Sequence, residues 1–202
     1  MFVLTMDQRG SQRASDLVPT LLAALSDIPA RLGFERSVGD EVQGLLETPD
    51  AVVEVVMRAL RSGDWYVGIG IGPVVLPLPD NPRAAGGPAF VAARRAVDRA
   101  KKTGDRVPLS VQAAKPAAEA AEAAEAVLCL IGRLVRARST AEWRVLDQMQ
   151  PGVRGQQRAV AHHLGITPQA VSKAVLRSGW QEEQAGRHAA AVLLALAATT
   201  AG

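Results

Sequence analysis

The chain has 202 residues, of which 48% are hydrophobic, and a formal net charge of +3. This is enough apolar material for the cores of one or two domains. Aromatic residues make up 3%, which argues against a stacking platform for single-stranded nucleic acid. Cys129 is the one cysteine, so a disulfide framework and a zinc–cysteine site are excluded. No apolar run approaches the roughly 18 residues of a membrane span, and the first residues do not resemble a signal peptide. We therefore expect a soluble, cytoplasmic protein with no membrane partner.

The first 112 residues alternate between strand and helix patterns. The predicted elements are a strand at 2–6, a helix at 17–32, strands at 33–38 and 42–47, a helix at 50–61, strands at 65–71 and 74–78, a helix at 89–102 and a strand at 107–112. This order predicts an α+β sandwich with helices on one face of an antiparallel sheet. The alternating glycines of 68–72 are interpreted as positions of close backbone packing, because no lysine follows them as in a phosphate loop.

Helical patterns dominate the remainder of the chain. An Ala/Glu repeat follows Lys115-Pro116 and has high helix propensity. We divide the chain into a front domain at 1–112, a connecting helix at 113–137 that is also a candidate dimer seam, and an all-α domain at 138–202. No alternating strand pattern follows Arg177, so no β-wing is expected.

Residues 156–175 have the pattern of a helix, a tight turn and a second helix. Gly165 suits a left-handed helix end, Thr167 is a good N-cap, and Pro168 falls at the first helical position. A continuous apolar seam is predicted from Val160, Leu164, Ile166, Val171 and Val175. The pattern is typical of a helix-turn-helix whose second helix enters the major groove of DNA. A plain helical hairpin is the alternative.

The outward positions of this segment suit double-stranded DNA. The polar residues would address base edges and the basic ones phosphates: Thr167, Gln169 and Ser172, and Arg158, Lys173 and Arg177. Residues 131–180 hold eight Lys/Arg against two acids, a net charge of +6, whereas 1–112 hold thirteen of each. This local excess of positive charge is expected at a phosphate-binding surface. We expect a homodimer, because one short helix buries too little surface for tight specific binding.

An acidic group is predicted in the front domain. Asp7 follows the first strand, Asp40 lies at the tip of a hairpin, and Glu41 is next to it. Carboxylates gathered in this way suit Mg²⁺ or Mn²⁺ with a nucleotide. Gly10 and Ser11 stand at the expected entry to a helix, where backbone N–H groups favour phosphate. The alternative is that Asp7 caps the helix and Asp40 occupies a turn, and the spacing leaves both open.

Four short motifs in the front domain resemble the SatD-like family and, more distantly, the class III nucleotidyl cyclases and the diguanylate cyclases. They are MDQRGS at 6–11, VGDEVQGLL at 38–46, GIGIG at 68–72 and GGPAFVAARRA at 86–96. The resemblance covers residues 2–112. It implies a ferredoxin-like, palm-type sandwich, in which Asp7 and Asp40 hold two metal ions over a nucleoside triphosphate and subunits pair head to tail.

The match to the cyclases is partial. Arg94 corresponds to their transition-state arginine, but Arg36 stands where adenylyl cyclases keep a base-reading lysine. Phe90 replaces the asparagine that orients the ribose, and Arg83-Ala84 replace a purine-reading aspartate. The resemblance therefore implies a degenerate cyclase-like domain for ligand sensing or dimerisation. Its candidate nucleotide contacts are Gly10, Ser11, Arg36 and Arg94.

The sequence thus predicts a sequence-specific DNA-binding transcriptional regulator. Two alternatives differ from it only in the front domain. One is a metal-dependent nucleotidyl cyclase or transferase that carries a helix-turn-helix, and the other is a dimerisation scaffold without a ligand.

Overall fold

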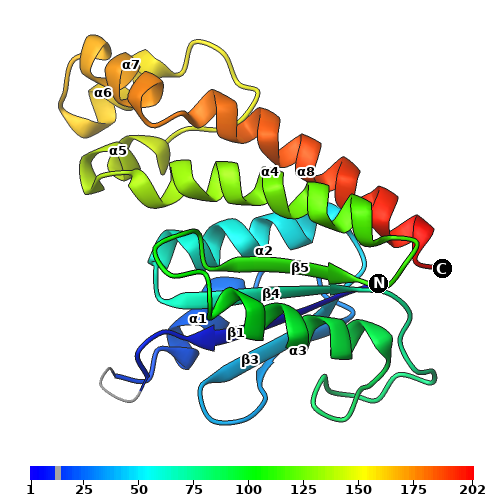
Figure 1. Ribbon diagram of the computed structural model, residues 1–202. Coiled ribbons are helices and arrows are strands. Elements are labelled where there is room, and N and C mark those ends of the chain that lie inside the picture. Colours follow the sequence, from blue (N-terminus) through cyan, green and yellow to red (C-terminus); the bar gives the residue numbers. More distant parts are fainter. Residues whose placement is uncertain (12–14) are drawn as a thin grey trace.

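The computed structural model describes residues 1–11 and 15–202. In these residues it is an α+β structure with a five-stranded mixed sheet and eight helices (Figure 1). The elements are β1 (Phe2–Gln8), α1 (Val18–Leu25), β2 (Leu32–Arg36), β3 (Glu41–Leu46), α2 (Pro49–Ser62), β4 (Trp65–Ile71), α3 (Pro88–Ala100), β5 (Leu109–Ala113), α4 (Ala118–Ala137), α5 (Thr140–Leu146), α6 (Gln157–Leu164), α7 (Pro168–Arg177) and α8 (Trp180–Thr200).

The sheet has the strand order β2-β3-β1-β4-β5. Its neighbours are antiparallel except for β4 and β5, which run parallel. In the central strand β1, Phe2, Leu4 and Met6 join the core formed with α1 and α2, whereas Val3 joins a smaller core with α3 on the opposite face. The predicted α+β class is confirmed, but the sheet is mixed rather than antiparallel, and helices cover both of its faces rather than one. The sheet is mixed because α3 connects β4 to β5, and a helical crossover of this kind joins parallel strands.

Two glycines of β4 determine which face α3 covers. A Cβ at Gly70 would lie 2.1 Å from the Ala89 carbonyl oxygen, and one at Gly68 would lie 2.3 Å from the Val97 nitrogen. The close packing predicted for this segment is thus confirmed. The connections β3–α2–β4 and β4–α3–β5 each join parallel strands and cross the sheet in the same direction. Because α2 and α3 lie on opposite faces, these two crossovers have opposite handedness. The usual preference for right-handed crossovers therefore does not explain the positions of both helices.

Two predicted elements differ from the structure because of prolines. The helix expected at 17–32 ends at Leu25, shortly before Pro29, since a proline disfavours helical geometry in the residue before it. The strand expected at 74–78 is irregular, because Pro73, Pro77 and Pro79 supply no N–H donor for a ladder.

The long helices α4 and α8 lie side by side and pack on α2 (Figure 1). Leu128 and Ile131 of α4 and Ala190 and Leu194 of α8 belong to the same buried core as the sheet. The core of the front domain therefore extends beyond residue 112 and includes the last helix of the chain. The predicted domain boundaries stay a prediction.

The helices α5, α6 and α7 form a unit with its own small core, which we call the three-helix unit. Its buried residues are Val145, Leu146, Val160, Ala161, Val171 and Val175. In Figure 1 the unit lies at one end of the α4–α8 pair, far from the chain termini. Within the described residues, no helix combines the length and the apolar character needed to cross a membrane.

Candidate functional site

The turn between α6 and α7 has the local geometry that its sequence predicts. Gly165 adopts a left-handed conformation (φ 64°, ψ 32°), and the Ile166 nitrogen donates to the Ala161 carbonyl at 3.0 Å. The Thr167 hydroxyl then accepts from the Ala170 nitrogen at 3.1 Å and caps α7. A sharp turn with both helix ends satisfied holds α7 in one orientation on α6.

One predicted member of the apolar seam is not buried. Ile166 is 39% exposed, whereas Val160, Val171 and Val175 are buried and Leu164 packs beside them. Ile166 lies in the turn itself, between the left-handed Gly165 and the cap. Its side chain is therefore outside the contact between α6 and α7 that the other four residues form.

A stripe of exposed side chains runs along α7. Gln169, Ser172, Lys173 and Leu176 follow the three- and four-residue spacing that puts them on one face. Leu176 is 77% exposed. Sequence reasoning missed it, although its spacing from Gln169 could have placed it on the stripe. Arg177 is exposed beside it.

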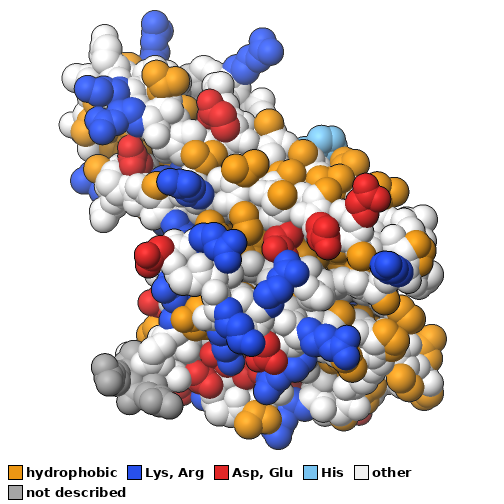
Figure 2. Space-filling model, viewed as in Figure 1, with side chains coloured by type: hydrophobic (Ala, Val, Ile, Leu, Met, Phe, Trp, Pro, Cys, Tyr) orange, Lys and Arg blue, Asp and Glu red, His pale blue; other side chains and the backbone are white. Residues whose placement is uncertain are grey.

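The basic excess on the three-helix unit is smaller than the sequence count indicates. Arg133 and Arg136 belong to α4, and Arg138 is buried against Glu183. The exposed basic residues that remain on the unit are Arg144, Arg154, Arg158, Lys173 and Arg177. Figure 2 shows blue side chains over this part of the molecule, with few acidic ones between them. Among the described residues, none of these five forms an ion pair.

A buried arginine joins the three-helix unit to the rest of the protein. Arg138 follows α4, and its side chain is 1% exposed. Its Nη1 lies 2.6 Å from the Glu183 carboxylate, and its Nε donates to the Ser178 carbonyl at 3.0 Å. Glu183 also accepts from Arg187, which reaches Glu54 of α2 at 2.6 Å. These contacts connect the end of α7 and the start of α8 to the helices over the sheet.

A second connection lies on the surface between α2 and α5. Arg61 donates to both carboxylate oxygens of Asp147, at 2.6 and 2.8 Å. Its guanidinium also lies 3.9 Å from the centre of the Trp143 ring. The three-helix unit is therefore held against the front domain from two sides.

In the front domain, two of the predicted acids are brought together. Asp7 of β1 is paired in register with Glu41 of β3. Two cations, one in α3 and one just after it, neutralise them: Arg94 forms an ion pair with Glu41, and Lys101 lies 2.5 Å from Asp7. We call these four residues the charge quartet. Burial raises the pKa of the Glu41 carboxyl, and the charge of Asp7 raises it further, while Arg94 and Lys101 oppose the change.

The predicted metal set is not assembled as such. Asp40 lies in the hairpin turn, outside the charge quartet. Among the described residues, no group of three or more His, Cys, Asp or Glu side chains is arranged to hold a metal ion. Asp7 and Glu41 instead have the cationic partners Lys101 and Arg94, which sequence spacing does not reveal because α3 approaches only in the tertiary structure.

The predicted phosphate contacts are not presented at the start of a helix. Gly10 and Ser11 lie in a turn after β1, and α1 begins only at Val18. The expectation that they open a helix is wrong. Arg36 forms an ion pair with Asp16, before α1, and donates to the Gly39 carbonyl in the hairpin turn, so its guanidinium already has two partners within the protein.

No protein-family model, curated protein or solved structure matches this chain. The resemblance to the SatD-like family and to the cyclases therefore stays a prediction, and function must be argued from the geometry.

Proposed function

We propose that this chain is a sequence-specific DNA-binding transcriptional regulator whose front domain serves ligand sensing or dimerisation. One observation carries the proposal. The helix α7 follows a capped glycine turn and exposes Gln169, Ser172 and Lys173 along one face. Among the described residues, none of these three side chains has an ion-pair or hydrogen-bond partner. Polar groups presented in this way from a rigid helix suit an external partner.

In the proposed complex, α7 is a recognition helix that lies in the major groove. Gln169 and Ser172 address base edges, and Leu176 offers an apolar contact for a thymine methyl group. Lys173 and Arg177 contact phosphates on the sides of the groove. Arg158, in the first turn of α6, contacts the backbone of the same site.

Features of the front domain support a role in ligand sensing or dimerisation. The order β1–α1–β2–β3–α2–β4, with the strands arranged β2-β3-β1-β4, agrees with the ferredoxin-like sandwich that the motifs predict. In a working two-metal enzyme the acids would face cations supplied by the solvent. Here Asp7 and Glu41 face Lys101 and Arg94, which favours a domain that no longer performs catalysis.

A homodimer completes the proposal. The helix α7 has 10 residues, so it spans about 15 Å and reads only a few base pairs. Two copies bound to half-sites about 34 Å apart would supply the contact area of a specific complex. The proposal therefore predicts a target sequence with two-fold symmetry.

The test begins with selection of target sequences from random duplex DNA by the full chain. Affinity for the selected duplex is then measured over a range of salt concentrations. Lys173→Ala should weaken binding to all sequences and reduce the salt slope by about one. Gln169→Ala should instead relax the preference at one base position. The matched control is Lys102→Ala, an exposed lysine just beyond α3. Equal salt slopes for Lys173→Ala and wild type would overturn the assignment of α7.

The second candidate is a metal-dependent nucleotidyl cyclase or transferase. The observation that favours it is the adjacent pair of carboxylates, Asp7 and Glu41, at one end of the sheet. The full chain is incubated with ATP or GTP and Mn²⁺ or Mg²⁺, and the products are separated by chromatography. A cyclic or linear nucleotide product that disappears in Asp40→Ala and Asp7→Asn would rank this candidate first. No product would leave the regulator as the stronger proposal.

A further inference from the structure

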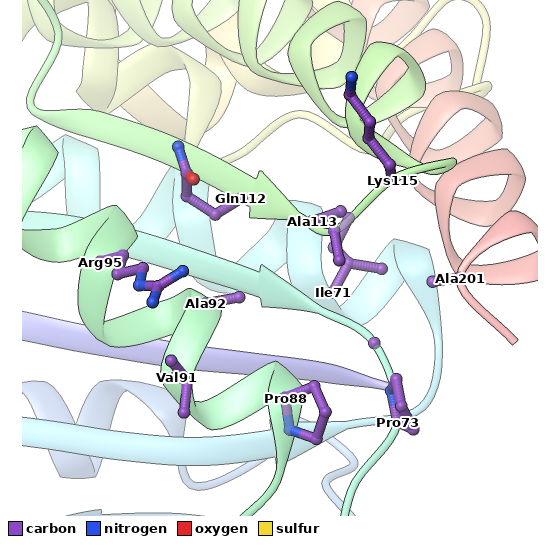
Figure 3. Close-up of a pocket in the computed structure, with 12 residues that line it drawn as sticks. Ile71, Pro73, Pro88, Val91, Ala92, Arg95, Gln112, Ala113, Lys115 and Ala201 are labelled. Carbon is purple, nitrogen blue, oxygen red and sulfur yellow. The ribbon is translucent and has the colours of Figure 1, made fainter.

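A cavity of about 460 Å³ that is open to solvent lies where the front domain meets the ends of the two long helices (Figure 3). Its walls come from the end of β4, the first half of α3, the end of β5, the segment that leads into α4, and Ala201 after α8. The volume is within the range of small-molecule sites. Crevices outside the carboxyl ends of parallel strands are preferred places for ligands, and β4 and β5 are the parallel pair of this sheet.

The lining is apolar with one cation directed into it. Ile71, Pro73, Pro88 and Val91 form much of the wall. In Figure 3 the guanidinium of Arg95 points toward the middle of the lining residues, whereas the Lys115 side chain extends away from them alongside α4. None of the described lining residues is acidic. Arg95 forms no ion pair within the described part of the chain, in contrast to Arg94 and Arg99 of the same helix.

The start of α3 does not itself provide an anion site. The Ala89 nitrogen donates to the Pro73 carbonyl at 3.1 Å, and the nitrogens of Phe90 and Val91 donate to the Gly87 carbonyl at 3.1 and 3.2 Å. The backbone N–H groups that bind phosphate in other proteins are thus already used. An anion in the cavity would have to be recognised by Arg95, and a planar guanidinium matches a carboxylate through two parallel hydrogen bonds.

We propose that this cavity binds a small monocarboxylate with an apolar chain. Arg95 holds the carboxylate, and the apolar chain lies against Ile71, Pro88 and Val91. This site is separate from the charge quartet and from α7, so it does not depend on DNA binding.

The position of the cavity also implies a regulatory effect, which rests on the proposed function. Lys115 lies just before α4, Ala201 lies just after α8, and the opposite ends of these helices adjoin the three-helix unit (Figure 1). A helix of 20 residues such as α4 spans about 30 Å. Because Ala114 and Ala201 line the same cavity, a ligand that fills it also contacts the chain just before α4 and just after α8. We expect this contact to favour one setting of the helix pair, and with it one setting of α7.

The test uses the full chain and a series of octyl compounds titrated by calorimetry and two-dimensional NMR. Octanoate is the probe, and octanol and octylamine are its neutral and cationic counterparts. Octanoate should bind saturably, at least about tenfold more tightly than either counterpart. The amide signals of Gly72, Ala92 and Ala113 should shift with it. Equal binding of the three compounds, or shifts confined to other residues, would overturn the proposal. So would the lack of saturable octanoate binding up to about 1 mM.

Variants locate the effect. Arg95→Gln should weaken octanoate binding about tenfold, and Val91→Trp should abolish it by filling the cavity from a half-exposed position. Arg83→Gln removes the same charge from an exposed loop outside the cavity and should bind octanoate as wild type does. Thermal unfolding of each variant distinguishes loss of the site from loss of the fold. Unchanged octanoate affinity in both cavity variants would contradict the assignment.

The effect of octanoate on DNA binding is measured in a separate experiment. The affinity for the selected DNA duplex should change by at least about fivefold at saturating octanoate, and this change should be absent in Arg95→Gln. If the chain binds no DNA at all, the proposed function fails while the octanoate titration still decides the site. If DNA affinity is the same with and without octanoate, the regulatory effect is wrong.

Discussion

The charge quartet and the three-helix unit contain the same kinds of charged residue in opposite surroundings. In the quartet, Asp7 and Glu41 are neutralised by Arg94 of α3 and by Lys101 just after it, on the face of the sheet that α3 covers. On the three-helix unit, Lys173 and Arg177 extend into solvent, without ion-pair partners among the described residues. Charged side chains that pair with one another affect the stability of the fold, whereas charged side chains without such a pair are available to an external partner.

The largest effect is expected at the buried junction between the two regions. Glu183→Ala removes the partner of Arg138, whose side chain is 1% exposed. An uncompensated buried charge costs about 3–5 kcal/mol, so the free energy of unfolding in urea should fall by that amount. Glu182→Ala, the exposed neighbour, is the control and should change it by less than about 0.5 kcal/mol. Equal losses for the two variants would show that the buried pair has no special role.

A smaller loss is expected where α3 meets the sheet. Gly70→Ala forces a Cβ to within 2.1 Å of the Ala89 carbonyl oxygen, so α3 must move away and carry Arg94 and Lys101 with it. The free energy of unfolding should fall by about 2 kcal/mol or more. Gly33→Ala, where an added Cβ meets nothing within 4 Å, is the matched control. A stable Gly70→Ala variant with wild-type unfolding behaviour would rule out this close approach.

The surface connection between the regions should contribute less. Arg61→Ala removes both the ion pair with Asp147 and the stacking on Trp143. Because both charged side chains are 43% exposed, solvent screens the pair, and we expect a loss of about 1 kcal/mol in unfolding free energy. Arg31→Ala, an exposed arginine outside this contact, serves as the reference. A loss above about 3 kcal/mol would contradict the expectation that solvent weakens this contact.

The charge quartet should appear in the pH dependence of stability. Because burial raises the pKa of Glu41 above its ordinary value of 4.5, the folded state binds this proton more tightly than the unfolded state. The resulting stabilisation is present at low pH and is lost as the pH rises through the folded-state pKa. Glu41→Gln cannot ionise, so the wild type should lose stability relative to it as the pH rises above the ordinary pKa of 4.5. Glu35→Gln, which keeps Glu41, is the control and should lose stability with rising pH as the wild type does. Parallel curves for Glu41→Gln and wild type would contradict the prediction.

The smallest effect on stability is expected for the open charges. Replacing Lys173 and Arg177 together by glutamine should change the unfolding free energy by less than about 0.5 kcal/mol. The same double variant should lower the salt slope of DNA binding by about two. A large loss of stability without a change in DNA affinity would reverse the comparison, because these residues would then belong to the fold.

Local features were predictable from the sequence because their causes lie within a few residues. Gly165 and Thr167 specify the turn before α7 through a left-handed conformation and a side-chain cap. Gly68 and Gly70 favour close backbone packing over a phosphate loop, because they lie within a strand and no lysine follows them. The outward stripe of α7 follows from helical periodicity, with Leu176 as the member that the sequence reading overlooked.

The tertiary structure decided which distant residues meet. Lys101 reaches Asp7 across 94 positions of the chain, and α3 takes the face opposite α2 because Gly68 and Gly70 open that face. The charge count from the sequence includes Arg138, but this side chain is buried in an ion pair with Glu183 at the junction. The faces of the sheet and the partners of each charge depend on packing between elements far apart in sequence. Periodicity and capping describe each element alone, and for that reason they predict the helices of this protein better than the contacts between them.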